Sequence, residues 1–106
     1  MALSGFLLPA WLTLAALAQT SGSPDIKTQA EGGDREAQFI LGQMCQNGQG
    51  VPQDVAEAIK WYRRAAEQDL GIAQYFLASL YDQNPQLSPD PGEALKWHRR
   101  AAEWVG

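Results

Sequence analysis

The chain is short, mildly acidic and poor in cysteine. Its 106 residues suffice for one small domain, and 12 acidic against 8 basic side chains give a formal net charge of −4. A nucleic-acid-binding protein needs a net basic surface to release counterions from phosphates, so we expect no nucleic-acid partner. The single cysteine cannot close an intramolecular disulfide.

Residues 1–18 are almost wholly apolar and carry no charged side chain. They end in Ala16-Leu17-Ala18 before a polar stretch, and signal peptidase requires small residues at these last and third-last positions. The run lacks the usual early Lys or Arg, and it is shorter than the ~20 residues of a membrane span. We predict a signal peptide cleaved after Ala18 and an exported protein, periplasmic or secreted. A membrane anchor through residues 1–18 is the main alternative, and a structural helix or a mis-set start is the third.

Residues 19–33 are rich in Ser, Gly, Gln and charged side chains, with Ile26 as the only large apolar residue. Such a segment buries too little apolar surface to offset the entropy lost on ordering. We predict a flexible lead-in.

From Asp34 onward the apolar residues follow a helical period. The stripe at i, i+3, i+4, i+7 and i+8 consists of Ala37, Ile40, Leu41, Met44 and Cys45. Glycines and Pro52 then break the pattern. Asp54, with Glu57 three residues later, has the spacing of a capping box and predicts a second helix that runs to about Glu67.

The sequence of residues 60–67 returns 36 residues later as residues 96–103, with seven of eight positions identical. A fixed offset of this size is typical of helical-repeat proteins. The second unit repeats the apolar stripe, has Asp90 and Glu93 in the places of the earlier capping pair, and continues inward with Ala94, Leu95 and His98. We therefore predict an all-α fold, a short α/α solenoid of two antiparallel helix pairs (four helices), plus the N-terminal apolar segment. The units span residues 34–68 and 69–106.

Residues 37–42, 48–54 and 58–68 resemble the Sel-one-like repeat, a relative of the tetratricopeptide repeat. The second unit keeps the matches at Ala73, Leu77 and residues 96–103, but it lacks the Gly-x-Gly-Val loop and has Ala78 for the usual glycine. The resemblance covers residues 34–104 and implies an α/α superhelix that acts as a protein-interaction scaffold with no chemistry of its own. Some exported relatives carry a cysteine pair in each repeat, and this chain lies outside that branch.

Many positions within the two units receive structural roles as close helix contacts, buried aromatics, loop glycines and caps. The alanines allow close approach of helices, and the tryptophans supply buried area and an indole N–H that needs a partner. These positions are Ala37, Leu41, Gly42, Gly48, Gly50, Asp54, Ala58, Trp61, Tyr62, Ala65, Ala66, Ala73, Leu77, Asp90, Ala94, Trp97, Ala101 and Ala102.

Two features are candidates for partner binding. Cationic side chains recur at i, i+3, i+4 and have the spacing to bind an acidic peptide, although cations late in a helix also complement its dipole, which we favour. Apolar Trp104 near the end of the sequence suggests self-association or partner capture. The candidates are Lys60, Arg63, Arg64, Lys96, Arg99, Arg100 and Trp104.

No catalytic or metal-binding pattern is discernible. His98 has no companion ligands at metal-binding spacing and stands where the first unit has Tyr62, so we interpret it as a packing residue. Cys45 lies on the inward stripe and is interpreted as a buried structural thiol, with a reactive or intermolecular thiol as the alternative. We expect no cofactor, no metal and no small-molecule substrate.

The leading functional hypothesis is an exported, non-enzymatic adaptor that binds a protein or peptide on the concave face of the solenoid. A small structural or assembly subunit that forms homo-oligomers is the first alternative. An exported hydrolase-like protein is the second, and the missing cysteine pairs argue against it.

Overall fold

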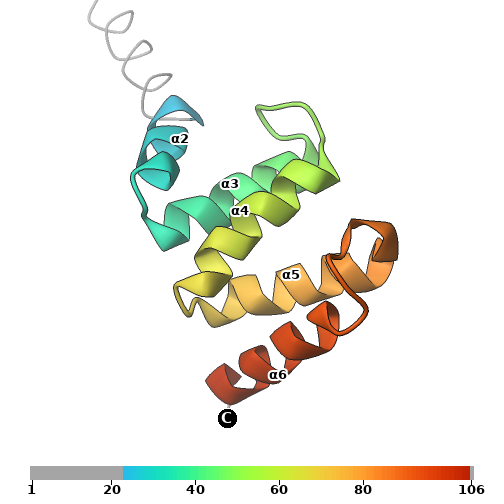
Figure 1. The fold of residues 1–106 in the computed structure, drawn as a ribbon. Helices are drawn as coiled ribbons and strands as arrows, with labels where there is room; N and C mark the ends of the chain where they lie inside the picture. The colour runs from blue at the N-terminus through green and yellow to red at the C-terminus, as the bar shows by residue number, and fades with distance from the viewer. Residues whose placement is uncertain (1–22, 106) are drawn as a thin grey trace, which may run out of the picture.

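The computed structural model describes residues 23–105, and this part of the chain is a stack of α-helices (Figure 1). The helical-repeat fold predicted from the sequence is confirmed. The predicted signal peptide at residues 1–18 lies outside the described residues. The elements are, in chain order, α2 (Ser23–Glu31), α3 (Arg35–Asn47), α4 (Val55–Glu67), α5 (Gly71–Gln83), the 3-10 helix η2 (Pro85–Leu87) and α6 (Glu93–Val105).

The first helix pair, α3 and α4, has well-formed ends. The Asp34 carboxylate accepts a hydrogen bond from the Ala37 N–H at 3.0 Å, and the Asp54 carboxylate accepts one from the Glu57 N–H at 3.1 Å. These bonds satisfy backbone donors that have no partner within the helix. At the other end of α3, Gly48 takes φ 70°, a left-handed conformation that favours glycine.

Replacing Asp54 by alanine is expected to lower the free energy of unfolding by about 1 kcal/mol, because the Glu57 N–H loses its acceptor. Chemical denaturation followed by circular dichroism measures the change. Asp54→Asn is the matched control, since asparagine keeps a side-chain oxygen at the cap and is expected to be nearly neutral. An equal loss in both variants would contradict the capping role.

The start of α6 differs from the prediction that Asp90 and Glu93 repeat the earlier capping pair. The Asp90 carboxylate accepts a hydrogen bond from the N–H of Gly92 at 2.9 Å, a turn two residues long, and α6 begins only at Glu93. Asp and Asn form such local turns readily, and the turn here competes with the cap. The side chain of Glu93 is buried and has a different role, described below.

Helix α2 corrects the prediction of a flexible lead-in for the part of residues 19–33 that the structure describes. Within α2, the Gln29 side chain donates to Asp25 at 3.0 Å. Ala30 is fully buried, and its carbonyl accepts a hydrogen bond from the Gln38 side chain at 3.0 Å. Ile26 packs against the core. The composition of residues 19–33 does not predict this helix, because the contacts that stabilise it come from α3.

Helix α2 corresponds to the second helix of a repeat that precedes the first described helix pair. At the same 36-residue offset, the Gln74 side chain donates to the Ala66 carbonyl at 3.1 Å, which repeats the bond between Gln38 and Ala30. The links after α2 and α4 also match, since Gly33 and Asp69 both take positive φ, 105° and 63°. Within residues 23–105, the solenoid therefore consists of one second helix followed by two helix pairs.

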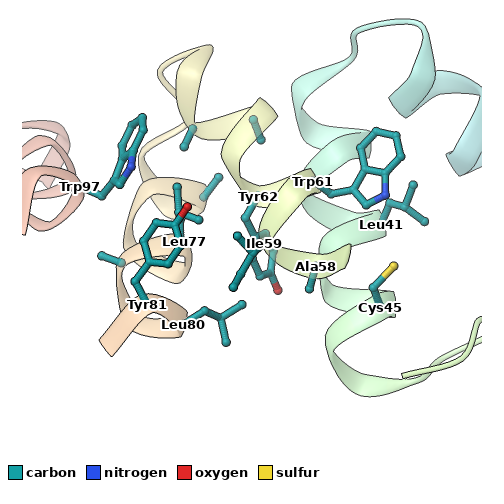
Figure 2. Packing of buried hydrophobic residues seen from close by; sticks show 14 of the residues in the cluster. Leu41, Cys45, Ala58, Ile59, Trp61, Tyr62, Leu77, Leu80, Tyr81 and Trp97 are labelled. Carbon is teal, nitrogen blue, oxygen red and sulfur yellow. The ribbon is translucent and has the colours of Figure 1, made fainter. Parts of the chain in front are cut away.

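The core combines small and large buried residues (Figure 2). The largest fully buried side chains are Trp97, Tyr62 and Leu77. Ile40 and Leu95 were predicted to face inward but are 40% and 54% exposed. Leu95 lies on α6, whose main contact in the described residues is with α5, whereas α3, which carries Ile40, contacts both α2 and α4.

Candidate functional site

A buried carboxylate, Glu93, joins three helices. Its Oε1 accepts hydrogen bonds from Trp97 Nε1 at 3.2 Å and from Arg63 Nη2 at 3.3 Å, and Lys96 Nζ lies 3.3 Å away. Arg63 also donates to the Tyr81 hydroxyl at 2.9 Å. Pairing and hydrogen bonds of this kind offset the cost of burying a carboxyl group. We therefore assign the cluster a structural role, which is to link α4, α5 and α6.

Most of the cationic candidates are likewise engaged within the chain. Arg64 lies over the Trp61 ring, with Cζ 4.8 Å from its centroid, and Arg100 donates to Asp69 at 2.8 Å. Contacts of this kind favour the structural interpretation of these charges over an acidic-peptide site. The cations with a carboxylate or a tryptophan ring nearby are Lys60, Arg63, Arg64, Lys96 and Arg100, and Arg99 is exposed.

The Cys45 thiol is buried and unpaired. Burial raises the pKa of this thiol, and the nearby carboxylates of Glu57 and Asp54 raise it further by a smaller amount. The raised pKa disfavours the nucleophilic thiolate. Within residues 23–105, no group of three or more His, Cys, Asp and Glu side chains is placed to hold a metal ion. In the same range, no helix has the length and apolar character that crossing a membrane requires.

His98 lies 2.7 Å from Asp82, measured from Nε2 to a carboxylate oxygen. In the first repeat the corresponding positions hold Tyr62 and Gln46, and the Tyr62 hydroxyl donates to the Gln46 side chain at 2.6 Å. The two repeats thus place a polar pair at the same point with different chemistry. His98 also borders the apolar face described next.

The outer face of α5 and α6 contains an apolar cavity of about 420 Å³. Three large apolar side chains on it are well exposed: Ile72 at 40%, Tyr75 at 55% and Trp104 at 61%. Grouped apolar side chains at the surface of a small protein mark interaction sites. The residues around the cavity include Gly71, Ile72, Tyr75, His98, Ala102 and Trp104.

The first repeat shows what covers the corresponding face there. Phe76 of α5 lies with its ring centroid 5.2 Å from that of Phe39 and 5.7 Å from that of Tyr62. The counterparts of Phe39 and Tyr62 are Tyr75 and His98, whose rings lie 6.4 Å apart beside the cavity. The cavity is therefore the place where the next helix of the stack would lie.

Trp104 forms one wall of this cavity through a close contact with Gly71. A Cβ atom on Gly71 would clash with Cγ of Trp104, so glycine is what lets the indole lie against the start of α5. In the first repeat the same positions hold Arg35 and Gln68, joined by a 2.7 Å hydrogen bond to the Gln68 carbonyl. The two positions thus hold a polar contact in the first repeat and an apolar contact in the second.

The antiparallel helix pairs stack on one another, and the hydrogen bond from Gln38 to Ala30 recurs 36 residues later as the bond from Gln74 to Ala66. This arrangement defines an α/α-repeat protein. The model of the Sel1 repeat matches residues 35–70 and 71–103. This chain belongs to the Sel1 repeat family, and the resemblance stated from the sequence is confirmed. Sel1 repeats are generally protein–protein interaction modules and are typically non-catalytic.

Two solved structures share the fold. A Sel1 repeat protein from Oxalobacter formigenes is 37% identical with a TM-score of 0.68, and the match covers 79% of this chain and 63% of that one. A protective antigen present in uropathogenic Escherichia coli strains, which displays an SLR fold, is 40% identical with a TM-score of 0.69 over 74% of this chain and 17% of its own.

A curated relative is the chitin synthase regulator SKT5 of Malassezia restricta, which is 46% identical over 41 residues. That match covers 39% of this chain and 3% of the relative. The chain thus spans less than two thirds of the length of each of these three proteins.

Proposed function

We propose that this chain is a non-enzymatic interaction module that binds a protein partner on the outer face of α5 and α6. One observation carries the proposal: this face holds an apolar cavity of about 420 Å³, whereas its counterpart in the first repeat is covered by a helix. The site lies at the end of the stack rather than on the concave face that we expected from the repeat class. Apart from the exposed Arg99, the cationic candidates have a carboxylate or a tryptophan ring of this chain nearby.

Site-specific photo-crosslinking in the native host tests the proposal. A photoreactive p-benzoylphenylalanine in place of Tyr75 is expected to form an adduct with a partner protein, and Ala102→Arg in the same chain is expected to abolish that adduct. The same photoreactive residue in place of Ala56, an exposed position on α4, is the matched control and is expected to give no such adduct. An adduct that persists with Ala102→Arg, or none at Tyr75, would overturn the proposal.

The assembly alternative uses the same face and gives a different product. If the chain works by self-association, the adduct at Tyr75 has twice the mass of the chain and forms with the purified protein alone. That result would replace the adaptor by a homo-oligomeric subunit.

We further propose that the protein is exported. Residues 1–18 support this proposal by their apolar character and by Ala16-Leu17-Ala18 before a polar stretch. The intact mass of the protein in each cell fraction is the measurement. We expect an exported species that begins at Gln19, whereas a full-length species in the membrane would favour an anchor and a full-length soluble species would contradict both.

A further inference from the structure

Each junction between repeats contains the same hydrogen bond. The Gln38 side chain donates to the carbonyl of Ala30 at 3.0 Å, and the Gln74 side chain donates to the carbonyl of Ala66 at 3.1 Å. Both glutamines are only 3% exposed. The acceptors lie among the last four residues of α2 and α4, where helix carbonyls have no partner within the helix. Each carbonyl also accepts a backbone N–H from the turn after its helix, that of Gly33 for Ala30 at 3.1 Å and that of Asp69 for Ala66 at 3.0 Å. The Gln side chain adds a further bond to the same oxygen and thereby sets the position of the next helix.

Helix α6 offers this acceptor a third time. Residues 101–103 repeat the Ala-Ala-Glu of residues 65–67, which places Ala102 in the role of Ala66. Ala66 is fully buried beneath α5, whereas Ala102 is exposed and borders the cavity. The cavity face therefore continues an interface that occurs twice in the described part of the chain, between α2 and α3 and between α4 and α5.

We infer that the partner presents an α-helix with an Ala-Gln pair and a large apolar residue two positions after the glutamine. This inference rests on the proposed function and specifies its partner. The pattern is that of Ala73-Gln74 with Phe76 in α5, and of Ala37-Gln38 with Ile40 in α3. The glutamine of the partner donates to the Ala102 carbonyl. Its apolar side chain lies against Tyr75 and His98, as Phe76 lies against Phe39 and Tyr62.

The helix comes from a different protein rather than from a second copy of this chain in the same fold. The two Ala-Gln helices within residues 23–105 are already engaged, Gln38 with Ala30 and Gln74 with Ala66. A second copy has no free helix of this pattern among its described residues to offer.

A synthetic peptide with the sequence of residues 69–83, which carries the α5 pattern, is the probe. Added to the isotope-labelled 106-residue chain, it is expected to shift the amide resonances of Tyr75, His98 and Ala102. A Gln74→Leu change in the peptide is expected to weaken binding about tenfold, because one hydrogen bond to a buried carbonyl is lost. Ala102→Arg in the chain is expected to abolish binding, and Ala56→Arg is the control that leaves it unchanged.

Three results would overturn the inference. The first is the absence of amide shifts at these residues up to about 1 mM peptide, the affinity range of a weak complex. The second is equal binding of the unchanged peptide and the Gln74→Leu peptide. The third is dimerisation of the chain alone that Ala102→Arg abolishes. If the Tyr75 adduct forms in the host while the peptide does not bind, the proposed function is retained and the Ala-Gln partner is rejected. If neither the adduct nor peptide binding is seen, the proposed function and the Ala-Gln partner are both rejected.

Discussion

Replacing Trp97 by alanine is expected to lower the free energy of unfolding by about 3–5 kcal/mol. Trp97 is 1% exposed and is one of the largest fully buried side chains (Figure 2). Its removal leaves a large cavity between α5 and α6 and also takes away the indole N–H that Glu93 accepts at 3.2 Å. Small domains are stable by about 5–15 kcal/mol, so the loss is a large fraction of the total. Urea denaturation followed by circular dichroism measures it.

Trp104→Ala is the matched control, because this tryptophan is on the same helix but is 61% exposed. Its removal is expected to change stability by about 0.5 kcal/mol. Losses of similar size in the two variants would mean that Trp97 does not hold α6 in the way the structure indicates.

Gly42→Ala is expected to destabilise the chain by about 1–3 kcal/mol, although alanine is the better helix former by about 1 kcal/mol. A Cβ atom at this position would lie 2.6 Å from Cδ1 of Tyr62. Tyr62 cannot move aside easily, since it is fully buried and its hydroxyl donates to Gln46. Thermal unfolding of the single variant tests this expectation.

The second repeat suggests how the clash can be relieved. There, Ala78 replaces the glycine and His98 replaces the tyrosine. We therefore expect the double variant Gly42→Ala with Tyr62→His to lose less stability than the sum of the two single changes, as residues in contact are not additive. Additive losses would show that the glycine is not required by the tyrosine ring.

The helices α3 to α6 could be predicted because their apolar residues recur at helical spacing and because residues 60–67 return at residues 96–103. Helix α2 could not, because its stability depends on Ala30 and Ile26 packing against α3 rather than on its own composition. Its one visible signal is Ala30-Glu31, which aligns at the 36-residue offset with the Ala-Glu that ends α4.

The candidate site was predictable only in part. Trp104 stood out as an apolar residue near the end of the sequence, but Ile72 and Tyr75 lie off the inward stripe of α5 and carry no signal by themselves. They become recognisable once the first repeat shows that Phe39, the counterpart of Tyr75, packs on the following helix. Glu93 was misassigned as a cap because spacing alone cannot tell whether a carboxylate turns toward the backbone or toward an indole.

The order of the helices also has a consequence for the rate of folding. Among residues 23–105, the main contacts join each helix to the one before it and the one after it, and contacts between alternate helices, such as that of Arg63 on α4 with Glu93 on α6, are weaker (Figure 1). Such a topology has a low contact order, because closing each contact requires only a short loop. The chain should therefore fold quickly for its size, and an ordered helix pair can act as the template on which the neighbouring helix forms.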